Sequence, residues 1–267
     1  MAADYIQEAF DLSGQIAVVI GGNGSLGGAA ARALCKAGAT VLIVGRNEES
    51  CCTRVAELRD LGMTAAFRTG DATSPSDMQA ILGSVAADTD LGRVDILVNA
   101  TGSMVKKPLL DLSDDDWQSV MKTTLEAVRV PCQVFGRHMR ERGSGVIINF
   151  SSMGARMPLS ESVPYSCAKA AVDNLTRQLA WEMAPHGVRV NALAPGFFPA
   201  AQNREALKGE RGRQIRGNTA MLRYGEPDEI ATTILFLAAP ASRFVTGSIV
   251  EVHGGFDSVC LGFREPD

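Results

Sequence analysis

Tyr165, Lys169 and Ser152 are residue types that can together move a proton to or from a carbonyl oxygen. The tyrosine and the lysine are four residues apart, so a helix would present both side chains on one face. A tyrosine phenol titrates at about 10, and a lysine charge beside it favours the phenolate. The spacing therefore predicts a tyrosine with a lowered pKa that acts as acid and base, although helices also produce this pair by chance on their surfaces.

Ser152 ends a short apolar run that predicts a buried strand. The run GVIINFSS extends from Gly145 to Ser152, ahead of the Tyr165 pair. Open parallel sheets bind ligands outside the carboxyl ends of their strands. We therefore expect the serine hydroxyl to lie at a ligand-binding edge.

Short β-branched runs alternate with helix-length amphipathic segments along the chain. The expected strands are Ile16–Ile20, Thr40–Val44, Ala65–Arg68, Val94–Asn99, Val146–Phe150, Val188–Ala192 and Ser248–Val252. The expected helices are Gly27–Ala37, Glu48–Leu61, Pro75–Ala86, Ser113–Arg142, Tyr165–Met183 and Pro227–Leu237. This alternation predicts one doubly wound α/β domain over residues 1–267, with a mostly parallel sheet and helices on both faces.

A glycine-rich turn, GGNGSLGG from Gly21 to Gly28, follows the first expected strand. Glycines there let the backbone approach a pyrophosphate, whose charge then lies at the amino terminus of the next helix. The second strand ends in VGRN, where Gly45 replaces the acid that would bind the ribose of NAD and Arg46 suits a 2′-phosphate. We therefore expect NADP(H) to be favoured over NAD(H), unless Arg46 is a solvated surface arginine. Asp71 could accept from the adenine amino group or cap the next turn.

Composition narrows the class of protein. A formal net charge of −4 argues against general nucleic-acid binding, and no apolar run approaches the roughly 20 residues that span a bilayer. The N-terminus has acidic residues and no basic leader, so we expect no signal peptide. The six cysteines lack metal-ligand spacing, which predicts reduced thiols in a cytoplasm. The three histidines have no carboxylate or cysteine at ligand spacing, so we expect no metal.

Six motifs, in order, give the chain a resemblance to the classical short-chain dehydrogenases/reductases from about Gly14 to Gly255. They are GGNGSLGG, VDILVNATG (Val94–Gly102), NFSS (Asn149–Ser152), YSCAK (Tyr165–Lys169), VRVNALAPG (Val188–Gly196) and FVTGSIVEVHGG (Phe244–Gly255). The resemblance implies a Rossmann-like fold, a nicotinamide cofactor, and a homotetramer or homodimer.

The resemblance also implies a role for each matching residue. Ser152 would hold the substrate oxygen, Tyr165 would be the acid and base, and Lys169 would bind the nicotinamide ribose and lower the tyrosine pKa. Thr124 stands where the family has an asparagine that supports a water in the proton relay, and its hydroxyl could hold the same water. The implied cofactor contacts, beside Arg46 and the Tyr165–Lys169 pair, are Gly21, Asn23, Ser25, Leu26, Gly27, Asp71, Ala72, Asn99, Pro195, Gly196 and Phe198.

Four stretches look like the fructuronate reductase (D-mannonate oxidoreductase) branch and related sugar-acid dehydrogenases. They are PCQVF (Pro131–Phe135), SSMGARMPL (Ser151–Leu159), APGFFPAAQNR (Ala194–Arg204) and HGGF (His253–Phe256). A basic segment from Arg204 to Arg216 suits an anionic substrate, since a guanidinium can bind a carboxylate with two hydrogen bonds. Arg156 and Arg204 flank the expected site and are the expected substrate contacts. The alternative is a solvated, helix-forming face.

The chain departs from the family pattern at Ile20, Ser25, Ala100, Thr124 and Ala200. Three functions remain open. The first is an NADP(H)-dependent reductase of a keto sugar acid or similar compound. The second is a reductase of another carbonyl, such as a 3-oxoacyl chain or a cyclic ketone, and the third is a cofactor-binding scaffold with little turnover. The intact Ser152, Tyr165 and Lys169 set favours an enzyme.

Overall fold

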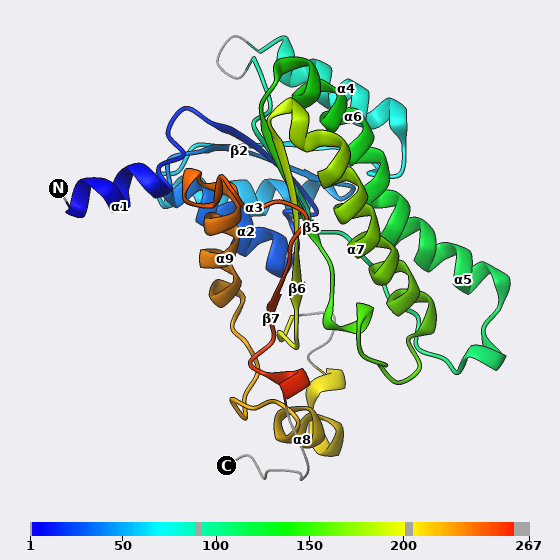
Figure 1. Cartoon of the computed structure of the whole chain (residues 1–267). Coiled ribbons are helices and arrows are strands. Elements are labelled where there is room, and N and C mark those ends of the chain that lie inside the picture. Colours follow the sequence, from blue (N-terminus) through cyan, green and yellow to red (C-terminus); the bar gives the residue numbers. More distant parts are fainter. Residues whose placement is uncertain (1, 89–91, 201–204, 259–267) are drawn as a thin grey trace.

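Seven strands form one sheet in the order β3-β2-β1-β4-β5-β6-β7 in the computed structural model of the chain (Figure 1). The structure describes residues 2–88, 92–200 and 205–258. The strands are β1 (Ile16–Ile20), β2 (Thr40–Gly45), β3 (Ala65–Thr69), β4 (Ile96–Asn99), β5 (Gly145–Phe150), β6 (Val188–Pro195) and β7 (Ile249–Val252). Each neighbouring pair in this order is parallel, so the predicted doubly wound α/β fold is confirmed.

Helices cover both faces of the sheet (Figure 1). One face carries α2 (Ser25–Lys36), α3 (Glu48–Asp60) and α9 (Ala231–Ala238). The other carries α4 (Pro75–Ala86), α6 (Ala127–Arg142) and α7 (Val163–Met183). Successive strand residues point to opposite faces, so Val19 belongs to the first core and Val18 to the second.

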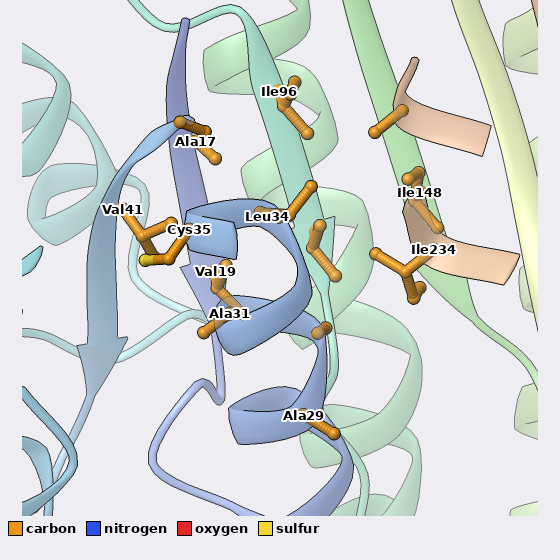
Figure 2. Close-up of a cluster of buried hydrophobic side chains, with 14 of the residues drawn as sticks. Ala17, Val19, Ala29, Ala31, Leu34, Cys35, Val41, Ile96, Ile148 and Ile234 are labelled. Atoms are coloured by element: carbon orange, nitrogen blue, oxygen red, sulfur yellow. The ribbon is translucent and has the colours of Figure 1, made fainter. Parts of the chain in front are cut away.

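Small side chains bring α2 close to the sheet (Figure 2). Ala29 and Ala31 of α2 are buried in one cluster with Val19 of β1, Ile148 of β5 and Ile234 of α9. A helix whose packed face is alanine can approach the strands more closely than one with larger residues. Because α2 directly follows the glycine turn, this packing fixes the turn at the end of β1.

The winding of the sheet reverses at β1, which pairs with β2 on one side and with β4 on the other. Ile20 at the end of β1 lies opposite Asn99 of β4, which in turn lies opposite Asn149 of β5. Open α/β sheets bind ligands in the crevice at such a reversal. The fold therefore places the glycine turn and the segment before Ser152 at one ligand-binding edge.

The long helix predicted from Ser113 to Arg142 is present but changes its hydrogen-bonding pattern midway. Ser113 caps α5 (Asp114–Met121) through the predicted reciprocal bonds with Asp116. A π-helical turn, η2 (Lys122–Glu126), then joins α5 to α6.

Two helices were not predicted from the sequence, α1 (Ala2–Phe10) and α8 (Gly209–Gly217). The short 3-10 helices are η1 (Leu109–Asp111), η3 (Met153–Ala155), η4 (Ala184–His186), η5 (Glu205–Leu207), η6 (Pro227–Ile230), η7 (Pro240–Ser242) and η8 (Phe256–Ser258). Within the described ranges, none of the helices combines the length and apolarity needed to cross a bilayer.

Candidate active site

Tyr165 and Lys169 lie one turn apart near the start of α7, as their spacing predicts. The Lys169 Nζ atom is 5.7 Å from the centre of the Tyr165 ring, and the Ser152 hydroxyl lies close enough to the Tyr165 phenol to lower its pKa. Ser152 precedes η3, and its Oγ also accepts a hydrogen bond from the Gly154 amide at 3.1 Å. The structure therefore brings the phenol, the ammonium and the hydroxymethyl group together beside the carboxyl end of β5.

The pKa of Tyr165 is raised from its ordinary value, because burial disfavours the charged phenolate. The Ser152 hydroxyl lowers the pKa but has the smaller effect. The direction expected from the sequence is therefore wrong for the chain by itself. The physical reason is that burial of the phenol outweighs the effects that favour the phenolate.

Lys169 is almost completely buried, with 2% of its surface exposed. Its Nζ donates to the carbonyl oxygens of Phe150 at 2.6 Å and Thr101 at 3.0 Å, which lie at or just beyond the ends of β5 and β4. Burial lowers the pKa of Lys169 to about 8, while the charge of Asp173 raises it. The ammonium is therefore charged at neutral pH and loses its proton not far above it.

Thr124 lies in the π-helical turn η2 and is fully buried. Its Oγ1 donates to the Ser103 carbonyl and accepts from the Ser103 amide, both at 3.2 Å. These bonds hold the loop after β4, which passes Lys169 so closely that a Cβ added to Gly102 would lie 3.4 Å from Nζ. Insertions of a π turn into α-helices are frequent at functional sites. Thr124 thus positions the loop beside Lys169, and its hold on a relay water stays a prediction.

The glycine turn can accept a pyrophosphate because side chains are excluded from it. Gly21 has a φ of +76°, and a Cβ added there would lie 2.6 Å from the Ala100 carbonyl oxygen. A Cβ added to Gly27 would overlap the Gly21 carbonyl oxygen. Gly24 caps α2 without a side-chain hydrogen bond, so no capping side chain competes for the first amides from Ser25 onward. These features fit a dinucleotide.

Three predicted cofactor contacts also have structural roles in the chain. The Asn23 side-chain amide donates to the Ser50 hydroxyl at 2.8 Å, which ties the glycine turn to α3. Leu26 packs against the first core, and Ala72 is buried in the second. Their placement beside β1 and β3 agrees with the prediction, and their contact with a cofactor stays a prediction.

Arg46 is exposed on the turn after β2. Its charge helps to lower the pKa of Asp71, although the hydrogen bond from the Thr73 amide is the largest cause. The Asp71 Oδ1 accepts from the Thr73 amide and hydroxyl, each at 2.9 Å. Of the two roles that the sequence left open for Asp71, the structure shows the turn cap.

Two predicted cofactor contacts, Asn99 and Phe198, have side chains inside the protein. Asn99 is fully buried, and its Nδ2 donates to the Asn149 Oδ1 at 2.9 Å. Phe198 is 6% exposed and packs against Gly225. Any contact that these two residues make with a bound molecule would be through the backbone. Pro195 ends β6, and the following Gly196 lies against His253, where an added Cβ would come within 2.6 Å of the histidine Cβ.

Arg156 lies on the surface after η3, and its guanidinium is bound by two carboxylates. It pairs with Glu251 of β7 and with Asp257, whose Oδ2 is 3.5 Å from Nη2. These acids compete with a substrate carboxylate for the guanidinium, which the sequence did not indicate. Arg204, the other predicted substrate contact, lies outside the described residues.

His253 has two carboxylates at ligand distance, contrary to the sequence expectation. Its Nε2 lies 3.4 Å from Glu251 Oε2 and 3.2 Å from Asp257 Oδ1, because alternate residues of an extended chain share a face and the following turn returns to it. Its Nδ1 accepts from two backbone amides at 3.2 and 3.3 Å, which puts the proton of the neutral ring on Nε2. A metal would need that nitrogen bare, and Arg156 already supplies a cation to both acids. The cluster is better suited to holding η8 against β7 than to binding a metal.

Two residues near the site were not predicted from the sequence. Asp173 is buried one turn after Lys169, at the same spacing of four, which could have revealed it. Lys106 lies in the loop after β4, and its pKa is lowered first by burial and then by the charge of Arg211, while Glu161 raises it. No sequence spacing could have shown that Lys106 and Arg211 lie near each other.

Comparison with known proteins agrees with this geometry. The sequence model of the adh_short_C2 family, described as Enoyl-(Acyl carrier protein) reductase, matches residues 21–257. The galactitol 2-dehydrogenase of Rhizobium johnstonii is 39% identical, over 94% of this chain and 98% of its own. The gluconate 5-dehydrogenase of Gluconobacter oxydans is 34% identical, over 93% and 96%. A solved gluconate 5-dehydrogenase from Burkholderia cenocepacia, in complex with NADP and tartrate, is 33% identical with a TM-score of 0.91 and covers 96% of this chain and 100% of that one.

Proposed function

Because the chain belongs to the short-chain dehydrogenases/reductases, a family of NAD(P)-dependent oxidoreductases, we propose that it interconverts a ketone and a secondary alcohol on a sugar acid with NADP(H). The observation that carries the chemistry is the placement of the Tyr165 phenol beside the Ser152 hydroxyl and the buried Lys169 ammonium. A fructuronate- or mannonate-like acid is the substrate that the four sequence stretches favour.

Each residue of the site has a separate role in proton transfer. When bound, the nicotinamide supplies or accepts the hydride. Ser152 holds the substrate oxygen, and Tyr165 donates a proton to it during reduction and accepts one during oxidation. Lys169 places a positive charge beside the phenol, where it opposes the effect of burial on the tyrosine pKa. Proton transfer by a positioned group is worth about 10²–10⁴ in rate.

Arg46 and the glycine turn support NADP(H) over NAD(H) in this proposal. Arg46→Ala is expected to raise the KM for NADPH about tenfold, the loss of roughly one charge-assisted hydrogen bond, and to leave the KM for NADH nearly unchanged. Steady-state kinetics with both cofactors measure the difference, and Arg140→Ala on the exposed side of α6 is the control. Equal changes for the two cofactors would show that Arg46 is only a surface residue.

The charges around the site support an anionic substrate. Lys106 and Arg211 come from segments distant in the chain, yet the charge of Arg211 lowers the pKa of Lys106. Two cations close enough for this effect favour a bound carboxylate. We place the substrate carboxylate here, with Arg156 and Arg204 as further contacts, and Arg156 would first have to exchange Glu251 or Asp257 for the substrate.

Arg211→Ala is therefore expected to raise the KM for a sugar acid about tenfold, while the KM for an uncharged polyol or ketone of similar size stays unchanged. Arg213→Ala, on the same helix but paired with Glu210 at 2.9 Å, is the matched control. A similar rise for charged and uncharged substrates would contradict the carboxylate assignment.

An uncharged polyol is the second candidate substrate. The relative at 39% identity is named for galactitol, and the guanidinium of Arg156 is already paired with Glu251 and Asp257. Cofactor-coupled turnover over sugar acids, polyols and their ketones, with NADPH and with NADH, tests both candidates. Preference for the acids supports the main proposal, whereas no turnover of any of them would support a scaffold.

We also propose that the chain forms a homotetramer or homodimer in the cytoplasm. Trp181 on α7 is 83% exposed and Phe244 fully exposed, and we expect both to lie in the subunit contacts of such an assembly. The five cysteines in the described ranges are unpaired, in agreement with a reducing compartment. Sedimentation velocity would measure the oligomeric state.

A further inference from the structure

Asp173 continues the row of functional side chains on α7. Tyr165, Lys169 and Asp173 follow one another at a spacing of four, which places them along one face of the helix. Asp173 is only 5% exposed, and aspartate is rarely buried to this degree unless it is paired. The burial of a carboxylate at the end of this row therefore requires a physical reason.

Few neighbouring groups hold the Asp173 carboxylate in a purely structural role. Its Oδ1 is buried without a hydrogen-bond partner. The groups that influence it are Lys169 and Arg177 on α7, the Ser151 hydroxyl beyond β5 and the Glu251 carboxylate on β7. Arg177 is exposed, so Lys169 is the buried cation of this set.

Lys169 in turn depends on Asp173 for charge compensation. The hydrogen-bond acceptors of its ammonium, the carbonyls of Phe150 and Thr101, carry no net charge. A buried ammonium is costly without an opposite charge nearby. Asp173 supplies that charge one turn along the same helix.

We propose that Asp173 is a positioning residue that keeps Lys169 in its charged form inside the closed site, an inference that rests on the role of Lys169 in the proposed function. Burial lowers the pKa of Lys169 to about 8, and Asp173 is the group that acts against this lowering. The pKa of Asp173 itself is raised by burial and, to a smaller extent, by Glu251, while Ser151, Arg177 and Lys169 lower it. Without the carboxylate, Lys169 would lose its proton at a lower pH, and Tyr165 would lose the cation beside it.

Asp173→Asn tests the proposal because it removes the charge and preserves the shape. The chain contains six lysines, so protein labelled with ¹³C at lysine Cε gives few resonances, and that of Lys169 is the one absent in Lys169→Met. The Lys169 midpoint is expected at about 8 in the wild type and about one pH unit lower in Asp173→Asn, the lower end of the effect of a nearby opposite charge. The alkaline limit of turnover should shift in the same direction.

Two further variants separate charge from packing. Asp173→Glu keeps the charge and should restore the Lys169 midpoint toward the wild-type value. Glu182→Gln, which removes an exposed carboxylate from the same helix, should leave it unchanged. If Asp173→Asn does not fold, the smaller Asp173→Ser carries the same expectation.

An unshifted Lys169 midpoint in the neutral variants would overturn the proposal. The titration needs no substrate, so its outcome is independent of the substrate assignment. If the Lys169 midpoint shifts but the protein turns over no substrate, the proposed function is contradicted. The electrostatic role of Asp173 would still be supported.

Discussion

A Tyr165→Phe variant is expected to keep its fold and its affinity for NADPH and to lose at least about 100-fold in kcat. The substitution removes a single hydroxyl, the one whose pKa the Ser152 hydroxyl lowers. Cofactor-coupled turnover measures the loss, and thermal unfolding and NADPH fluorescence titration show that fold and binding are retained.

Tyr224→Phe is the matched control for this result. The Tyr224 hydroxyl donates to the Leu207 carbonyl at 2.7 Å, so its removal costs one hydrogen bond but leaves Ser152, Tyr165 and Lys169 intact. Turnover close to the wild-type value is expected for this control. Turnover of that size in Tyr165→Phe as well would remove Tyr165 from the mechanism.

A Lys169→Met variant is expected to lose at least about 100-fold in kcat/KM, a loss of about 2.7 kcal/mol in transition-state stabilisation. Methionine fills a similar volume but brings neither the charge beside Tyr165 nor the donors that hold the Phe150 and Thr101 carbonyls. Steady-state kinetics measure the effect, and Lys36→Met at the end of α2 is the control. A change of less than threefold would be hard to reconcile with any role for the ammonium.

The same variant isolates the pH dependence that buried Lys169 gives to stability. Its folded pKa, about 8, lies below the ordinary lysine value of 10.5, so the unfolded chain binds more protons between these values. The unfolding free energy of the wild type should therefore rise relative to Lys169→Met as pH increases from about 8 to 10.5, by on the order of 3 kcal/mol, and the gain is lost again as pH falls from 10.5 to about 8. Denaturant unfolding across this range measures the difference. A difference that is constant with pH would show that the folded lysine titrates normally.

Much of the fold could be predicted because local patterns determine it. Strands such as Ile16–Ile20 are continuous apolar runs, as strands buried on both faces must be, and Ser113 with Asp116 carries its own helix-start signal. α1 and α8 were missed because their sequences lack a strong start signal, and α8 is largely polar.

The sequence predicted which residues form the proton-transfer site, but it did not predict their electrostatics. The spacing of Tyr165 and Lys169 places them on one helix face whatever surrounds them. The direction of the Tyr165 pKa depends instead on the burial of the phenol, which only the folded chain produces.

Ion pairs between residues far apart in the sequence could not be predicted for the same reason. Arg156 follows β5, whereas Glu251 lies in β7 and Asp257 just after it. The three residues meet only because the sheet places β7 next to β6, which lies beside β5. Arg156 lies about a hundred residues before both acids in the sequence, where no helical or strand periodicity connects it to them. The prediction that Arg156 contacts the substrate therefore did not include its two acidic partners.

The protonation of Tyr165 in the presence of cofactor is the most direct test of the account. The chain has three tyrosines, so ¹³Cζ-tyrosine labelling resolves the Tyr165 resonance, which Tyr165→Phe identifies. The chain alone should show a midpoint above about 10, as burial dictates, and saturation with NADP⁺ should bring it below that value. A phenol that keeps its elevated midpoint when the cofactor is bound would contradict the claim that Tyr165 carries the proton.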